Sequence, residues 1–547
     1  MESTMEILKK TDNDRTISGI PIKKIYSPHD TAGLDYERDL GRPGAVPFTR
    51  GAYPNMYRDK LWRIFQLSGY GTAEDERERI LYLLEQGETG FIMESDMSTW
   101  YLYDVDHPAV LARKDEVGQY GPPMFSLEEF EIALEGIPIE KLYCHPGGVG
   151  PPLSPFSHAC YFSVAQKRGI PLAELSGTGE GDFFLFYLSN LYKDQVGPTP
   201  GLRLNCDLVE FCVENMPRWI PISIPGYNAR ECNVNGYQEL AMTFANAVAY
   251  IDEILTRGKL KIDDFAYAIG GVSFATGRDF FEDIAKIRAS RRMWSKLLGE
   301  KYGAKDPRSL RLRIHALVQG SGYTYQQPLN NIVRGTYQAM AAGLAGVQSM
   351  GVAAYDEAIC IPSEMAHTMS IRTQQILQYE SNITNVVDPL AGSYFVESLT
   401  DEVENRAWEY MDKIDQEGGF IHCLESGFFH QEALKGTMQK QRKISSGELK
   451  VVGMNCFEME EEPYQVEAFR HNPDSWEIAM QRLEHLRQSR DEAKAQRCKD
   501  DLRKSCETGT NIMPVMMEAV RSAVTVGEVG NIFREVFGTW NPPKMMF

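Results

Sequence analysis

From Leu61 onward, short apolar runs alternate with segments whose apolar residues recur at helical spacing. Residues 72–87 predict the clearest helix, because a threonine precedes acidic residues in the first turn and a glycine ends the segment. The apolar run 90–93 then predicts a strand. Further strands are predicted at 142–145, 220–224, 265–269, 312–316 and 352–354, and further helices at 127–135, 158–168, 180–194, 203–214, 236–256, 278–298, 330–345 and 363–379.

This alternation of strand and helix, which covers roughly 330 residues, predicts an α/β fold. We expect a closed (β/α)8 TIM barrel over residues 51–400 rather than an open sheet. No G-x-G-x-x-G follows a strand and no G-x-x-x-x-G-K-[ST] occurs, which disfavours dinucleotide-binding and P-loop folds.

The segments on either side of the barrel have a different character. Residues 1–50 are rich in proline, glycine and charge and predict an extended N-terminal arm, either lying on the surface or contacting another subunit. Residues 401–547 predict a helical appendage. Within it we expect helices at 400–440, a turn and strand in KISSGELKVVGMN, one long charged helix at 474–505 with a solvated face, and one or two helices at 513–537.

Composition narrows the class of protein. The chain has 547 residues and is 43% hydrophobic, which is ample for a large core. Its net charge of −19 disfavours nucleic acid and anionic membranes as partners. The ten cysteines form no C-x-x-C pair, no signal-peptide pattern begins the sequence, and no apolar run approaches a membrane span of ~20 residues. We therefore expect a cytoplasmic protein with reduced thiols.

Familiar catalytic motifs are missing, but three strand ends carry informative residues. There is no H-E-x-x-H, no G-x-S-x-G and no cysteine–histidine cluster, so no metal site is expected in this chain. Small and amide side chains follow the strands instead, in GYNARE, QGSGYTY and AAYDEA. Small residues allow a bulky ligand to approach the backbone, although they also simply permit close helix packing. Such a barrel mouth suits a cofactor that brings its own chemistry.

These stretches resemble the large catalytic subunit of the methylmalonyl-CoA mutase family of adenosylcobalamin-dependent enzymes. The resemblance runs in the family's order from Gly19 to Pro543 and includes GYGTAEDERERILYLLEQGETGF, ENMPRWIPISIPGYNARE, PLNNIVRGTYQAM, QYESNITNVVDPLAGSYFVESLT and MEAVRSAVTVGEVGNIFREVFGTWNPP. It implies a substrate-carrying barrel, adenosylcobalamin as cofactor, and a radical mutase (an isomerase) acting on an acyl-CoA.

The resemblance also implies a partner. In the family a D-x-H-x-x-G motif supplies the histidine that ligates cobalt, and no such motif occurs in this sequence. We therefore expect a hetero-oligomer with a small cobalamin-binding subunit, as in isobutyryl-CoA and 2-hydroxyisobutyryl-CoA mutases. One alternative is a non-catalytic paralogue that serves as a binding or assembly subunit. Another is a cobalamin-independent barrel enzyme that uses Glu94 and Glu180 as an acid–base pair.

Several site residues follow from matching positions in the family. Glu357 matches the glutamate that contacts the adenosyl ribose, and Tyr227, Asn228 and Gln319 are expected to position the migrating group. The positions that face the corrin in the family are occupied here by Glu231, Gly322, Tyr323, Ala354 and Ala358.

The expected substrate pocket departs from that of methylmalonyl-CoA mutases. Leu67 replaces an aromatic wedge, and Asn190 replaces the arginine that pairs with the free carboxylate of the substrate. Asn228 replaces a histidine, Glu180 a glutamine and Glu94 a small residue. A buried carboxylate without a cation is costly, so methylmalonyl-CoA is disfavoured. Leu67 with Glu94 resembles the pairing in 2-hydroxyisobutyryl-CoA mutases, which predicts a branched or hydroxylated acyl group.

Recognition of the CoA arm is also altered. Basic and small residues of the family appear here as Lys60, Phe65, Gly147, Val149 and Ile269. We expect Lys60 to meet a phosphate, with Arg63 one turn away if the segment is helical. Thr178 completes the predicted substrate-binding set. Either CoA lies differently in this protein or the acyl carrier is another molecule.

Overall fold

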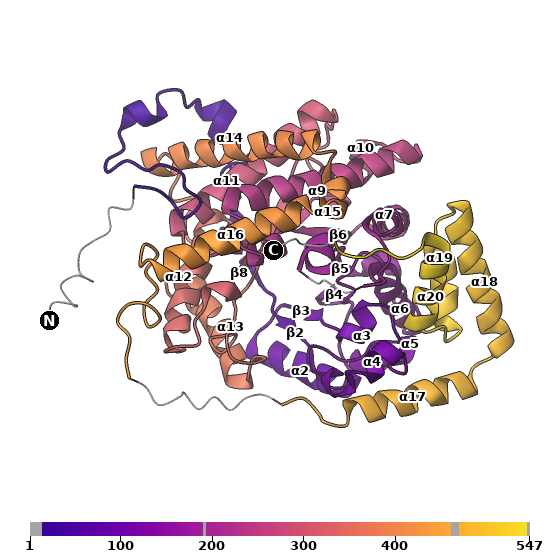
Figure 1. Cartoon of the computed structure of the whole chain (residues 1–547). Helices are drawn as coiled ribbons and strands as arrows, with labels where there is room; N and C mark the ends of the chain where they lie inside the picture. The colour runs from indigo at the N-terminus through magenta and orange to yellow at the C-terminus, as the bar shows by residue number, and fades with distance from the viewer. Residues whose placement is uncertain (1–13, 190–192, 461–469, 544–547) are drawn as a thin grey trace.

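A computed structural model describes residues 14–189, 193–460 and 470–543. Its centre is one sheet (Figure 1). Each pair of neighbouring strands in it is parallel. The order across the sheet is β1-β9-β8-β7-β6-β5-β4-β3-β2. The strands are β1 (Arg63–Ile64), β2 (Leu67–Ser68), β3 (Gly90–Met93), β4 (Tyr143–His145), β5 (Ser176–Glu180), β6 (Trp219–Pro225), β7 (Gly271–Thr276), β8 (Arg313–Val318) and β9 (Ser349–Gly351).

The sheet curls on itself because its two outermost strands are neighbours in the chain. β1 pairs with β9 on one side, and β2 pairs with β3 on the other. Between them the side chain of Gln66 takes the place of ladder bonds: its Oε1 accepts from Val352 N at 2.8 Å and its Nε2 donates to Val352 O at 3.1 Å. Counted as one interrupted strand, β1 and β2 complete an eight-stranded α/β barrel, which confirms the predicted fold class.

Helices follow the strands and cover the outside of the sheet (Figure 1). They are α2 (Ala73–Gln86), α3 (Met97–Trp100), α4 (Pro108–Leu111), α5 (Leu127–Ala133), α6 (Ser154–Lys167), α7 (Pro198–Asn215), α8 (Gly226–Glu231), α9 (Gly236–Arg257), α10 (Ile262–Ile269), α11 (Phe280–Lys296), α12 (Asn330–Ala345) and α13 (Glu364–Tyr379). Short 3₁₀ and π turns occur at Pro28–Thr31, Tyr36–Leu40, Met56–Arg58, Lys114–Glu116, Leu172–Glu174, Phe184–Ser189, Leu297–Lys301 and Gly320–Gly322.

Three of the predicted barrel elements were wrong. Residues 265–269 belong to α10, and the strand begins at Gly271; three buried residues, Phe265, Ala266 and Ile269, have helical spacing and pack inward. The strand expected at 352–354 lies at 349–351. The helix expected at 180–194 overlaps the end of β5, and its described helical part is limited to Phe184–Ser189.

The chain after the barrel is helical, as expected, but its elements differ in detail. Its helices are α14 (Tyr394–Gln416), α15 (Phe420–Glu425), α16 (Phe428–Ser445), α17 (Ser475–Ser489), α18 (Glu492–Thr508), α19 (Met513–Arg521) and α20 (Val526–Phe537). The predicted single helix at 474–505 is two helices, because Asp491 caps α18 by accepting a hydrogen bond from Lys494 N. The strand expected in KISSGELKVVGMN is wrong: α16 runs to Ser445, and only an isolated bridge joins Val452 to Cys456.

Helices α17 to α20 are fixed to the barrel by charged groups (Figure 1, yellow). Arg487 donates to Asp104 at 2.8 Å and to Asp106 at 2.6 Å. Asp104 is buried and also accepts from Thr525 Oγ1 and Gly527 N at the start of α20. Part of the charged helix therefore contacts protein rather than solvent.

The described part of the N-terminal arm packs against the barrel of the same chain. Ile17 N donates to Asp279 at 2.8 Å, and Ser18 Oγ accepts from Gly236 N. The division into units at residues 50 and 400 stays a prediction. No helix in the described ranges is long and apolar enough to cross a membrane, and no disulfide joins any of the ten cysteines, all of which are described.

Candidate active site

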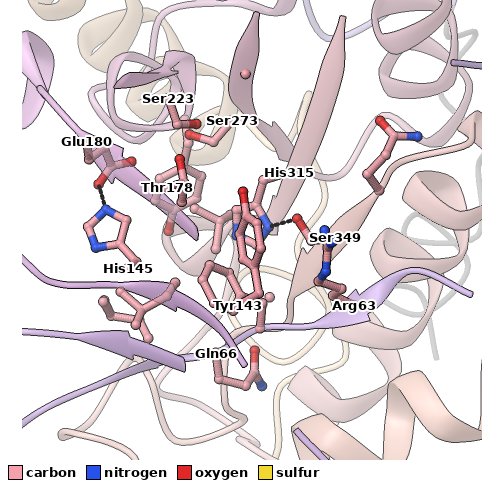
Figure 2. A pocket seen from close by; sticks show the side chains of 18 of the residues that line it. Arg63, Gln66, Tyr143, His145, Thr178, Glu180, Ser223, Ser273, His315 and Ser349 are labelled. Atoms are coloured by element: carbon pink, nitrogen blue, oxygen red, sulfur yellow. Dashed lines mark hydrogen bonds and ion pairs between the residues drawn. The ribbon is translucent and has the colours of Figure 1, made fainter. Parts of the chain in front are cut away.

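A cavity of about 380 Å³ runs through the barrel. Residues from every strand line it, including Arg63 and Arg313 at the amino ends of β1 and β8, and Glu180 at the carboxyl end of β5. TIM barrels are usually filled by branched side chains. Here the bore stays open because small residues line it: Ser176, Thr178, Ser223, Gly271, Ser273, Ser349 and Gly351. Thr178, Ser223, Ser273 and Ser349 are labelled in Figure 2.

Hydroxyl groups line the middle of this bore. Ser349 Oγ lies 2.9 Å from His315 Nδ1 (Figure 2). Thr178 Oγ1 donates to the carbonyl of Gly179 at 3.2 Å. Ser273 Oγ is buried and has no hydrogen-bond partner in the described part of the chain. The middle of the bore therefore offers polar contacts to a long, narrow ligand without presenting a full charge to it.

Glu94 lies at the carboxyl end of the cavity, directly after β3. Its side chain is buried, and its Oε1 accepts from Ser95 N at 3.1 Å and from Trp100 Nε1 at 3.0 Å. Burial raises the pKa of Glu94 to about 8, and these two hydrogen bonds offset only part of that rise. At pH 7 the group is therefore mostly a neutral acid.

Glu180 faces the same end of the cavity. Burial, together with the charges of Asp182 and Glu94, raises its pKa well above the ordinary range. Its Oε2 lies 3.8 Å from His145 Nε2 (Figure 2). Burial lowers the pKa of His145 to about 3, so at neutral pH this contact joins two neutral groups.

Asp182 is a site residue that sequence reasoning missed. It is buried and accepts hydrogen bonds from Phe184 N, Leu185 N and the side-chain amide of Asn228. Burial raises its pKa to about 7, against the effect of those bonds. No sequence signal marked it, because β5 ends at Glu180 and Asp182 lies in the loop beyond that strand.

The structure brings together most of the predicted substrate-binding residues. Tyr227 and Asn228, in α8 at the end of β6, line the cavity with Glu94 and Glu180. Leu67 borders it too, with a 52% exposed side chain, in a strand paired to β3. An aliphatic surface and two carboxyl groups thus share the carboxyl end of the bore.

The predicted cofactor-facing residues come from the loops after β6, β8 and β9. Ala354 and Glu357 line the cavity. Glu231 Oε2 accepts from Ser321 N at 3.1 Å, while its Oε1 is buried and has no partner among the described residues. Burial and the neighbouring charges of Glu231 and Asp356 raise the pKa of Glu357 to about 7, although its side chain keeps contact with solvent.

These loops approach one another closely. A Cβ on Gly320 would lie 3.1 Å from Glu357 Cγ. Tyr323 is buried, and its hydroxyl donates to Ala353 O at 3.0 Å, whereas Ala358 is exposed. A mouth built from small residues with an unsatisfied carboxylate oxygen fits a large, flat cofactor that presents hydrogen-bond donors.

Other predicted residues lie elsewhere. Gln319 and Gly322 line a second cavity, and Lys60 is exposed outside the lining of the first. Ile269 is buried in α10, and Asn190 lies outside the described residues. Arg63 begins a strand, so it does not follow Lys60 by a helical turn; its charge nevertheless lowers the pKa of Lys60.

Comparison with known proteins assigns the family. The sequence profile described as methylmalonyl-CoA mutase matches residues 15–539. The chain belongs to the methylmalonyl-CoA mutase family. It is similar to the 2-hydroxyisobutanoyl-CoA mutase large subunit of Aquincola tertiaricarbonis, with 35% identity over 537 residues, which cover 97% of this chain and 93% of the relative.

Longer relatives belong to the same family. The methylmalonyl-CoA mutase of Cereibacter sphaeroides is 36% identical over 528 residues, which cover 96% of this chain and 72% of the relative. The methylmalonyl-CoA mutase of Escherichia coli is 33% identical over 536 residues, which cover 97% of this chain and 73% of the relative. Members of the methylmalonyl-CoA mutase family are cobalamin-dependent isomerases, so this chain is an isomerase. Within the described residues, no group of three or more His, Cys, Asp or Glu side chains is arranged to hold a metal ion.

Proposed function

We propose that this chain is the large subunit of an adenosylcobalamin-dependent mutase that isomerises a branched or hydroxylated acyl-CoA, and not methylmalonyl-CoA. The observation that carries the proposal is the polarity of the open bore. Arginines stand at its amino end, and carboxyl groups stand at its carboxyl end. A small cobalamin-binding subunit with a D-x-H-x-x-G motif completes the enzyme.

The arginine end suits the phosphates of CoA. Among the described residues that line the cavity, the arginines are Arg63, Arg218 and Arg313, each at or just before the amino end of a strand. The guanidinium of Arg63 lies 4.2 Å from the ring centroid of Tyr143, which holds it at the rim. A six-residue strand such as β7 spans about 20 Å. This length supports a pantetheine arm that threads the bore and presents its thioester at the carboxyl end.

The carboxyl end suits an uncharged acyl group. A substrate carboxylate placed beside Glu94 and Glu180 loses its hydration without gaining a cationic partner, because no arginine or lysine lines this end in the described residues. A substrate hydroxyl can exchange a hydrogen bond with Glu94, and a methyl group can pack on Leu67. The 2-hydroxyisobutanoyl-CoA mutase relative is consistent with this substrate class.

The residues of this chain then have distinct tasks. Tyr227 and Asn228 orient the thioester, with Asn228 held in place by Asp182. Glu231, Tyr323, Ala354 and their neighbours form the surface against which the cofactor rests. Adenosylcobalamin, when bound, supplies the radical that abstracts hydrogen from the substrate. The barrel wall shields that chemistry from water.

The decisive experiment is a turnover assay with the small subunit and adenosylcobalamin present. Methylmalonyl-, isobutyryl- and 2-hydroxyisobutyryl-CoA are compared for the wild type and Glu94→Gln. We expect turnover of one of the latter two, and a larger loss for the hydroxylated than for the branched substrate in Glu94→Gln. Glu85→Gln, an exposed site on α2, serves as the matched control. Efficient methylmalonyl-CoA turnover would overturn the substrate assignment, and no turnover of any acyl-CoA would favour a non-catalytic subunit.

A second prediction concerns assembly. The chain alone should bind adenosylcobalamin weakly, because it offers one wall of the corrin site and no D-x-H-x-x-G histidine. Adding the small subunit should make the binding tight. Absorbance spectroscopy measures the bound cofactor, and size-exclusion chromatography measures the assembly of the two subunits. Tight, histidine-ligated binding by the chain alone would contradict the two-subunit enzyme.

A further inference from the structure

A second cavity, of about 280 Å³, lies beside the active-site mouth. It separates α16 (orange in Figure 1) from the loops that follow β6, β7 and β8. Arg230 of α8, Arg278 after β7 and Lys440 of α16 line it together with Gln319 and Gly322.

The three cations have only neutral acceptors within the part of the chain that the structure describes. Arg230 is buried; it donates to Val234 O at 2.7 Å, and its Nε has no partner there. Arg278 Nη2 donates to Gly322 O at 2.7 Å, and its buried Nη1 has no partner there. Lys440 Nζ donates to Asn233 Oδ1 at 2.8 Å and to Ser321 O at 3.3 Å. Buried donors without acceptors are costly, so this arrangement is incomplete without a ligand.

Two of the nearby acids are paired with lysines. Glu432 accepts from Lys435 at 2.8 Å, and Glu239 forms a buried ion pair with Lys286 at 2.6 Å. The charge of Glu231 raises the pKa of Lys440, but by less than burial and the two arginines lower it. Burial and the charges of Arg278 and Arg230 lower the pKa of Lys440 to about 8. This concentration of positive charge is notable in a chain whose net charge is −19.

We propose that the second cavity binds a phosphate group, either as inorganic phosphate or as the phosphate of a small monoester. The guanidinium groups of Arg230 and Arg278 and the ammonium of Lys440 converge on a space too small for a macromolecule and large enough for a compact anion. Lys435 and Lys443 also line this space, but each is paired with a glutamate. Guanidinium forks match phosphate oxygens, and a phosphate near its dianionic form balances most of the local charge.

The ligand would act on the neighbouring turn. Lys440 and Arg278 hold the carbonyls of Ser321 and Gly322, in the turn Gly320–Gly322. An anion between these cations fixes their side chains, and through them it orders a turn that borders the active-site mouth. Phosphate occupancy and the geometry of that mouth are therefore coupled, whatever acyl group the enzyme uses.

The test is whether the full chain binds phosphate, measured by isothermal titration calorimetry at constant ionic strength. We expect saturable binding of one inorganic phosphate, competition by sulfate, and at least tenfold weaker binding in Arg278→Gln and in Lys440→Gln. Arg442→Gln is the matched control, because this exposed residue of α16 removes the same charge two positions away without lining the cavity. Glycerol 3-phosphate, titrated in parallel, distinguishes a monoester from free phosphate.

Two results would overturn the proposal: no saturable binding of either probe, or equal affinity in the wild type and both cavity variants. Lys440→Gln lies on a partly exposed helix face, so it remains informative if Arg278→Gln fails to fold. Because the titration needs neither cobalamin nor an acyl-CoA, its failure leaves the proposed mutase activity untouched.

Discussion

A buried acid that keeps its proton at neutral pH makes the folded chain sensitive to alkali. Glu94 has a folded pKa of about 8, against an ordinary value of 4.5. Between these values the native chain binds more protons at this site than the unfolded chain does. The stability that Glu94 contributes is therefore complete below about pH 4.5 and is lost as the pH rises towards 8.

Glu94→Gln should remove this dependence. Glutamine keeps an oxygen that can accept from Ser95 N and Trp100 Nε1. We expect the variant to match the wild type near pH 5 and to exceed its stability at pH 8 by about 3 kcal/mol. Thermal unfolding across that range checks this, with Glu85→Gln giving parallel curves for comparison. A constant difference at all pH values would mean that Glu94 is already ionised in the folded chain.

The residues of the site were predictable in unequal measure. Glu94 and Glu180 could be named from the sequence as neighbours, because the family resemblance supplied their positions. Asp182 could not, since only the fold places it against Asn228. The hydrogen bond from Gln319 to Arg230 O could not be predicted either, because it depends on how the segments after β6 and β8 meet.

Among the helices, α20 illustrates how local chemistry anchors a remote element. Thr525 caps it, and Glu528 completes the capping box. Burial opposes ionisation of Glu528, but hydrogen bonds from Arg490, Thr525 N and Lys499 outweigh it and lower its pKa to about 2. The resulting stability is present above about pH 4.5 and is lost as the pH falls towards 2.

Glu528→Gln should therefore destabilise the C-terminal helices at pH 7. We expect a loss of about 2 kcal/mol, since the charge-assisted bonds to Arg490 and Lys499 weaken. The loss should shrink as the pH falls below 4. Denaturant unfolding of the variant at pH 7 and pH 3.5 measures this, with exposed Glu492→Gln as a control that also contacts Arg490. Equal destabilisation at both pH values would assign the effect to packing.

The helical elements were easier to predict than the strands. The helix at 330–345 was expected at the positions where α12 lies, because it combines apolar periodicity with a following glycine. β5 reads SGTGE, and such small residues resemble a loop. They form a strand because the bore needs small side chains to leave space for a ligand. Packing in the folded barrel thus overrides the low strand propensity of glycine and serine.

At the scale of the whole molecule, the proposed function assigns CoA binding to one end of the bore and the chemistry to the other. Arg63→Gln should raise the KM for an acyl-CoA about tenfold and leave kcat nearly unchanged, because a phosphate contact is the same in ground and transition states. The matching acyl-pantetheine lacks the phosphates, so wild type and variant should use it equally. Arg58→Gln, exposed near the same end, is the control. A fall in kcat without a change in KM would place Arg63 outside CoA recognition.

The interrupted first strand has a consequence for biosynthesis. Gln66 joins the barrel to Val352, a partner 286 residues further along the chain. At ribosomal rates of about 5–20 residues per second, this partner is made some 15–60 s later. During that interval the edge of β1 that later pairs with β9 has no partner strand, and the barrel cannot close. Chaperone dependence should therefore be greatest for ribosome-bound chains that stop short of β9, and it should fall once that strand has emerged.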